Sequence, residues 1–189
     1  MRPQSRSSAR LFVGVPLTDA VRQELDAHLR QALGGRSLPG RPVPPANWHL
    51  TLKFLGSTDA GQQARLVELL RQAPLGAAFP LEFGGLGAFP KIWRASVLWV
   101  GVSQGQPELG ALARVLEDAA AEAGFAREQR PFAAHLTLSR IDPPQDATDV
   151  VSTVPAFAGR MEVREVVLFR SHLGGGPARY EPLERFPLS

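Results

Sequence analysis

Two segments of the 189-residue chain repeat the same four residues, His-Leu-Thr-Leu, beginning at His49 and at His135. The copies lie almost half a chain apart. Residues two positions apart in a strand point to the same face, so each His shares a face with the Thr that follows it. We therefore expect His49 with Thr51, and His135 with Thr137, to line one cavity. Leu50, Leu52 and Phe54 should lie on the opposite, buried face.

This set of side chains suits the cleavage of a phosphate ester. With an unperturbed pKa near 6.5, one imidazole can activate water as a base while the other protonates the leaving oxygen as an acid. Threonine hydroxyls can donate hydrogen bonds to the non-bridging oxygens. Because the reaction needs one protonated and one neutral imidazole, a plot of kcat/KM against pH should have its maximum between about pH 6 and 8. For a single copy, a structural histidine in a half-buried strand is the better explanation, but two copies favour a shared function.

Other kinds of site are disfavoured. The chain has no cysteine, which excludes disulfides, thiolate catalysis and cysteine zinc sites. The remaining histidines, His28 and His172, have no metal-ligand spacing and no acidic cluster, so no metal or other cofactor is expected. No G-x-S-x-G elbow, P-loop or G-x-G-x-x-G turn before a helix is present.

The composition is that of an ordinary globular protein, with 44% hydrophobic and 21% charged residues. No apolar run approaches the length of about 18 residues that a membrane helix needs, so no membrane association is expected. The lack of cysteine agrees with a reducing compartment, and we expect a cytoplasmic protein. The net charge is +3, and the cations are nearly all Arg, which suits phosphate binding but does not by itself indicate RNA.

The hydrophobic pattern predicts strands alternating with helices in two similar halves. Strands are expected at 10–17, 48–56, 81–89, 96–102, 134–141, 163–171 and 179–186, helices at 18–33, 62–72 and 107–124, turns at 90–94 and 142–145, and a proline loop at 38–46. The long-range repeat predicts an α+β fold of two pseudo-symmetric lobes, each with an antiparallel sheet and helices, around a cleft. Residues 1–9 should be a flexible N-terminus, and residues 10–189 a single bilobal domain.

Further residues are candidates for substrate binding. Arg130 and Arg140 flank the second motif and could hold phosphate, although simple alternation places Arg140 opposite His135 unless a bulge or strand end intervenes. Phe12 could stack on a base, and core packing is the alternative for it. The same two explanations apply to four other aromatic residues, Trp48, Trp93, Phe132 and Tyr180.

The chain resembles the 2H phosphoesterase superfamily. The paired motifs carry the resemblance, together with an opening RLFVGVPL at 10–17 and a closing RYEPL at 179–183. It extends over nearly the whole chain and is supported by residues 47–56, 97–102 and 130–138. More narrowly, the chain is similar to the bacterial RNA 2′,3′-cyclic phosphodiesterases, historically called 2′-5′ RNA ligases. One departure is Ala134, where relatives often carry Pro.

The resemblance implies the opening of a terminal 2′,3′-cyclic phosphate to a 2′-phosphate. It implies that His49 is the proton donor to the 3′ oxygen and that His135 is the proton acceptor from water. The substrates would be RNA ends, including tRNA fragments, or cyclic nucleotides, and the protein would act as a monomer. Two alternatives remain open: the same site could join RNA ends through a 2′-5′ linkage, or the protein could bind RNA or nucleotides without turnover.

Overall fold

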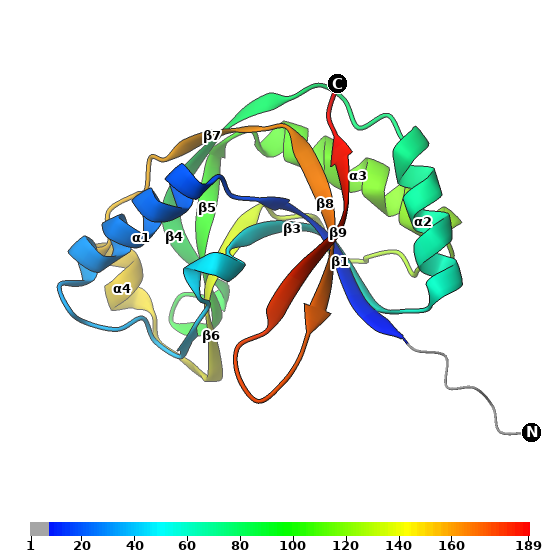
Figure 1. Ribbon diagram of the computed structural model, residues 1–189. Coiled ribbons are helices and arrows are strands. Elements are labelled where there is room, and N and C mark those ends of the chain that lie inside the picture. The colour runs from blue at the N-terminus through cyan, green and yellow to red at the C-terminus, as the bar shows by residue number, and fades with distance from the viewer. Residues whose placement is uncertain (1–7) are drawn as a thin grey trace, which may run out of the picture.

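Strands dominate the computed structural model, which describes residues 8–189 (Figure 1). The nine strands of this part of the chain are β1 (Ala9–Pro16), β2 (Arg41–Pro42), β3 (His49–Thr58), β4 (Phe79–Lys91), β5 (Arg94–Gln104), β6 (His135–Gln145), β7 (Arg160–Val163), β8 (Glu165–His172) and β9 (Arg179–Pro187). They form one curled antiparallel sheet in the order β7-β4-β5-β6-β3-β1-β8-β9, and β2 pairs with β6.

The sheet consists of two halves that meet at the repeated motifs. One half contains β7, β4, β5 and β6, and the other contains β3, β1, β8 and β9. A register pair between Leu50 of β3 and Leu136 of β6 joins them. Both leucines are buried, so the second residue of each motif lies in the core. The predicted α+β fold with two similar halves is confirmed, and the halves share one continuous sheet.

The helices are exchanged between the two halves. The described residues form four α-helices, α1 (Asp19–Leu33), α2 (Ala60–Gln72), α3 (Gln106–Glu122) and α4 (Thr148–Thr153), and one 3-10 turn, η1 (Pro45–Asn47). α3 follows β5 in the chain but packs against β3, beside α2. α1 follows β1 but lies with α4 beside β4, where the His28 ring packs on Phe157 (Figure 1). Each half therefore depends on a helix from the other.

Local sequence accounts for the helix ends. Thr18 caps α1 by accepting a hydrogen bond from the Val21 backbone N–H at 3.3 Å, and Gly34 ends it in the left-handed conformation. A capping box between Asp59 and Gln62 starts α2 two residues earlier than its hydrophobic pattern predicts. The inward faces of both helices are apolar and join the core.

Several expected boundaries were wrong for identifiable reasons. β6 continues to Gln145 through the expected proline turn. Beyond Ile141 it pairs with β5 at a single position, so the missing backbone N–H groups of the prolines cost few hydrogen bonds between strands. The expected strand 163–171 breaks at Arg164, because β7 pairs with β4 whereas β8 pairs with β1. The turn expected at 90–94 shrinks to two residues, and the proline loop contains β2 and η1.

Both motif strands carry a bulge at the same position. Thr51 pairs with Gly14 and Lys53 with the adjacent Val13, which leaves Leu52 without a partner. Leu138 is bypassed in the same way, between the pairs Thr137–Trp99 and Ser139–Leu98. Each bulge reverses the alternation of faces that follows it.

The reversal has two consequences for the sequence-based predictions. Lys53 and Ser139 point into the interior and are 5% and 0% exposed. Phe54 was expected to be buried with the leucines but is 57% exposed, so that prediction was wrong. Arg140 lies on the same face as His135, because the bulge at Leu138 reverses the alternation that would otherwise have placed it opposite.

The expected flexible N-terminus falls mostly outside the described residues. Of the residues expected to be flexible, Ala9 is the first residue of β1. Within the described part of the chain, no helix combines the length and apolar character that crossing a membrane requires.

Candidate active site

His49 is held by contacts on both ring nitrogens. Its Nδ1 lies 2.7 Å from the carbonyl oxygen of Asn47, and its Nε2 lies 2.9 Å from the Thr51 hydroxyl. A carbonyl can only accept, so Nδ1 carries the hydrogen and Nε2 is the nitrogen available for proton transfer. Phe12 of β1 stacks on the ring at 4.7 Å, and Tyr180 of β9 meets it edge-on at 5.1 Å.

His135 has the same arrangement in the other half. Its Nδ1 lies 2.7 Å from the carbonyl oxygen of Ala133, which is again two residues before the histidine. The same tautomer follows, with Nε2 available. Phe89 of β4 meets this ring edge-on at 5.0 Å, and Trp99 of β5 lies 6.4 Å away. Each imidazole is therefore oriented by one backbone carbonyl and packed among aromatic rings, which for His49 include Phe169 at 6.3 Å.

The two motifs converge on one pocket, as the sequence predicted. His49, Thr51, His135 and Thr137 all line it. The same pocket is lined by four residues from outside the motifs, Val43, Asn47, Arg140 and Tyr180. Two imidazoles, three hydroxyl groups and one guanidinium thus surround a single small space, a set suited to a tetrahedral anion.

Burial and positive charge lower the pKa of both imidazoles. Desolvation lowers the pKa of His49 to about 4, and the charges of Arg140 and His135 act in the same direction. The pKa of His135 is also lowered, first by burial and then by Arg140. Each orienting carbonyl acts in the opposite direction, because it accepts from the ring. Both rings are therefore mostly neutral at pH 7 unless an anion offsets the local charge.

Arg140, which lines the pocket, has a second arginine as its neighbour across the strands. Arg41 of β2 is directly opposite Arg140 of β6 in the register of the two strands. Like charges in that position are unfavourable, and neither guanidinium forms an ion pair with an acidic residue of the described chain. Such a pair is stabilised when it shares an anion.

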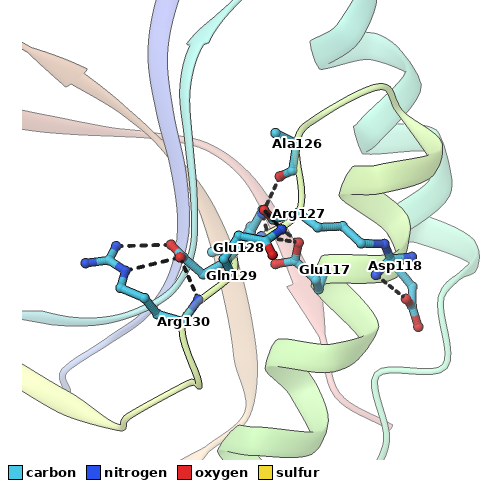
Figure 2. Close-up of polar contacts among 8 residues, drawn as sticks. Glu117, Asp118, Ala126, Arg127, Glu128, Gln129 and Arg130 are labelled. Carbon is cyan, nitrogen blue, oxygen red and sulfur yellow. Dashed lines mark hydrogen bonds and ion pairs between the residues drawn. The ribbon is translucent and has the colours of Figure 1, made fainter.

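The structure does not bring Arg130 into the pocket. Its Nε donates to Oε1 of Glu128 and its Nη2 donates to Oε2, both at 3.1 Å, in the bidentate arrangement that Figure 2 shows. The same contact lowers the pKa of Glu128 to about 2. Phe12 is also absent from the residues that line the pocket, because it is buried beneath the His49 ring.

Of the other aromatic candidates, Tyr180 alone lines the pocket. Trp48 is buried, and its indole N–H donates to the Val43 carbonyl at 3.1 Å, so it packs in the core. Trp93 and Phe132 are exposed and do not line the pocket.

Sequence reasoning missed the residues that orient the imidazoles. Asn47 and Ala133 act through backbone carbonyls, so their side-chain identities give no signal beyond their shared place two residues before a motif histidine. The Asn47 side chain also donates to the carbonyl of Ala178 at 2.6 Å, which ties the β8–β9 loop to the pocket. Arg41 escaped notice because its pairing with β6 depends on long-range register.

The site offers few ligands for a metal ion. No group of three or more His, Cys, Asp and Glu side chains gathers anywhere between residues 8 and 189. The pocket itself supplies two imidazoles and no carboxylate.

Comparisons with known proteins identify the family of the chain. The family described as "2'-5' RNA ligase superfamily" matches residues 17–175. An RNA 2′,3′-cyclic phosphodiesterase of Escherichia coli is 34% identical over 95% of this chain and 97% of its own. One from Archaeoglobus fulgidus is 33% identical over 94% and 99%. The chain spans only 56% of a Geobacillus stearothermophilus relative, at 33% identity.

Solved structures show the same similarity in three dimensions. Escherichia coli LigT complexed with 3′-AMP superposes with a TM-score of 0.80 at 31% identity, covering 97% of this chain and 99% of that one. A protein of Thermus thermophilus gives a TM-score of 0.77 at 30% identity, covering 95% and 97%.

Proposed function

The chain belongs to the 2′-5′ RNA ligase superfamily, and from this we propose that it hydrolyses the 2′,3′-cyclic phosphate at an RNA end to a 2′-phosphate. One observation carries the proposal. His49 and His135, held in the same tautomer, line one pocket with Thr51, Thr137 and Arg140. An acid, a base and donors for the phosphate oxygens are thus present together.

The proposed reaction is a direct displacement at phosphorus. Neutral His135 accepts a proton from water at Nε2 as the water oxygen bonds to phosphorus. The bond between phosphorus and O3′ breaks, and protonated His49 gives its Nε2 proton to O3′. The two threonine hydroxyls and Arg140 stabilise the non-bridging oxygens, on which negative charge is concentrated. One proton is taken up and one is released, so the two histidines exchange protonation states in each turnover.

The acid role requires His49 to gain a proton that it lacks in the free protein at pH 7. Its pKa is held near 4 by burial and by nearby positive charge. A bound phosphodiester carries a negative charge into the same pocket, which stabilises the imidazolium and raises the pKa. Substrate binding and protonation of the donor therefore reinforce each other. Because the two histidines share one tautomer, the assignment of donor and acceptor comes from the resemblance and is tested below.

Substrates of this kind are RNA ends that carry a cyclic phosphate, including tRNA fragments, and cyclic nucleotides. Both histidines and both threonines of the pocket come from a single chain, which supports action as a monomer. A catalyst accelerates both directions, so the same site could also join RNA ends through a 2′-5′ linkage. Binding of RNA without turnover is the remaining alternative, and the intact pair of motifs disfavours it.

The decisive assay is incubation with a nucleoside 2′,3′-cyclic phosphate, and with a short RNA ending in one, in the presence of a chelator. Chromatographic separation of the product isomers should show the 2′-phosphate. Accumulation of the 3′-phosphate would contradict the proposed direction of opening. Saturable binding with no product would leave the non-catalytic alternative.

A further inference from the structure

Lys53, at the bulge of β3, makes contacts that the proposed reaction does not use. Its side chain is 5% exposed, and its ammonium lies 2.9 Å from the Glu117 carboxylate of α3. It also donates to the carbonyl of Ala126 at 3.0 Å. The Glu117 carboxylate also accepts a hydrogen bond from the backbone N–H of Glu128 at 2.9 Å (Figure 2). One ion pair, with Lys53 buried and Glu117 partly buried, thus fixes the segment after α3 at two points.

This segment leads directly to the other motif. Glu128 accepts the backbone N–H of Arg130 at 3.0 Å, three residues before Ala133 (Figure 2). The carbonyl of Ala133 is the group that orients His135. Lys53 therefore belongs to the strand of His49 but anchors the segment that orients His135.

Ser139, at the equivalent bulge of β6, makes the reciprocal contact. It is fully buried, and its hydroxyl donates to the carbonyl of Pro39 at 2.5 Å. Next to it, the Val43 backbone N–H donates to the Leu138 carbonyl at 2.8 Å. Between these two contacts, any side chain at Gly40 would clash with a backbone oxygen of β6, so the segment packs tightly on that strand. It continues to Asn47, whose carbonyl orients His49.

Stability alone does not explain a buried ammonium at this position. Removing an ammonium and a carboxylate from water is costly, and apolar residues of similar volume often give equal or greater stability. An ion pair with two further hydrogen bonds instead fixes the geometry of the segments it joins. Both interior residues also result from bulges, which bend their strands and redirect single side chains.

We propose that Lys53 and Ser139 are reciprocal positioning residues, each of which, from the strand of one imidazole, holds the backbone segment whose carbonyl orients the other imidazole. The proposal rests on the proposed function, in that the two imidazoles must be aligned on one phosphate. It makes each half of the sheet responsible for the geometry of the other half's histidine.

The test compares Lys53→Met and Ser139→Ala in the full chain, with the imidazole nitrogens of both histidines followed by NMR during a pH titration. Loosening an orienting carbonyl weakens an interaction that raises the pKa of its histidine. Lys53→Met should therefore lower the pKa of His135 and leave that of His49 unchanged. Ser139→Ala should lower the pKa of His49 and leave that of His135 unchanged. Simple loss of the Lys53 charge would raise a pKa, so the sign separates the two effects.

Three controls separate positioning from loss of stability. Glu117→Gln keeps an acceptor for Lys53 and for the Glu128 backbone, and should behave like the wild type at His135. The double variant Lys53→Met with Glu117→Met removes both charges, which avoids an unpaired buried carboxylate, and should still perturb His135. Val163→Ala truncates a fully buried side chain in β7, which pairs with β4 at the far end of the sheet, and should leave both titrations unchanged.

Kinetics supply a second readout. Lys53→Met should lower kcat by about 10- to 100-fold with KM changed less than about twofold, because misalignment affects the transition state more than binding. Perturbation of the histidine on the mutated strand, of both equally, or of neither would overturn the proposal. Wild-type protein without phosphodiesterase activity would refute the proposed function, while the NMR comparison would still decide whether the crossed positioning exists.

Discussion

Leu50 and Leu136 face each other across the junction between β3 and β6, and each follows a pocket histidine directly. Both are buried, at 1% and 0% exposure. The separation of the two imidazoles is therefore set by the centre of the core. A pocket built in this way resists local loosening, so substitutions within it should affect chemistry with little effect on folding.

Removal of either pocket imidazole should abolish most activity. We expect His49→Ala and His135→Ala each to lower turnover of cyclic phosphate by at least about 10²-fold, since each removes an acid or a base. Far-UV circular dichroism should remain that of the wild type. His172→Ala provides the matched control, because this histidine pairs with Glu181 outside the pocket and should be dispensable. Near-normal activity in either pocket variant would refute the mechanism.

The roles of donor and acceptor can be distinguished by the leaving group. A nitrophenyl phosphodiester needs no protonation of its leaving oxygen, so it should restore activity to His49→Ala more than to His135→Ala. Initial rates with nitrophenyl and cyclic substrates measure the ratio. Greater rescue of His135→Ala would exchange the two assignments.

Activity should peak on the acidic side of neutrality. The profile of kcat/KM reports the free protein, where the pKa of His49 is about 4 and that of His135 lies below 6.5. The form with one protonated and one neutral imidazole is most populated between the two pKa values. The maximum of kcat/KM should therefore fall below pH 6.5, lower than the range of pH 6 to 8 expected from the sequence. Bound phosphate raises both values, so the kcat profile should lie at higher pH. A kcat/KM maximum above pH 7 would contradict these pKa shifts.

The threonines should depend on their hydroxyl groups rather than on their shape. Thr137→Ser and Thr51→Ser keep the donor and should be mild, whereas the Val variants should cost roughly 1–4 kcal/mol of transition-state stabilisation. Ratios of kcat/KM measure the difference. Equal behaviour of Ser and Val at both positions would show that these side chains only pack.

Arg140 should control both binding and the pH profile. Its charge lowers the pKa of both imidazoles, so Arg140→Gln should raise both values and move the kcat/KM maximum to higher pH, while KM increases. Arg130→Gln is the control: the Arg130 guanidinium is paired with Glu128 and should have little effect. A larger loss from Arg130→Gln than from Arg140→Gln would mean that the closed ion pair opens toward substrate.

The face pattern of the motifs was predictable from sequence, because alternation over four residues needs no knowledge of partner strands. The positions after each motif were not. Bulges at Leu52 and Leu138 arise from pairing with β1 and β5, and they determine where Phe54 and Arg140 point. The sequence around each motif does not show which strands will pair with it, so these bulges could not be predicted.

Long-range contacts explain the other differences as well. Arg130 looked suitable because it lies near His135 in the sequence, but a carboxylate two residues away binds it. The strand expected at 163–171 was a single apolar run, yet its two parts pair with opposite ends of the sheet. The helix ends were better predicted, since Thr18 and Gly34 act on their immediate neighbours.

The position of β1 inside its half of the sheet has a consequence for synthesis. β1 pairs with β3 on one side and with β8 on the other, and β8 is made more than a hundred residues later. Until β8 emerges from the ribosome, the outer edge of β1 presents unpaired backbone groups that can recruit other strands. The half that carries His135 has all its strands by Val163, so it can fold first. A nascent chain would therefore become competent for chemistry only at its last strands, when the surroundings of His49 close.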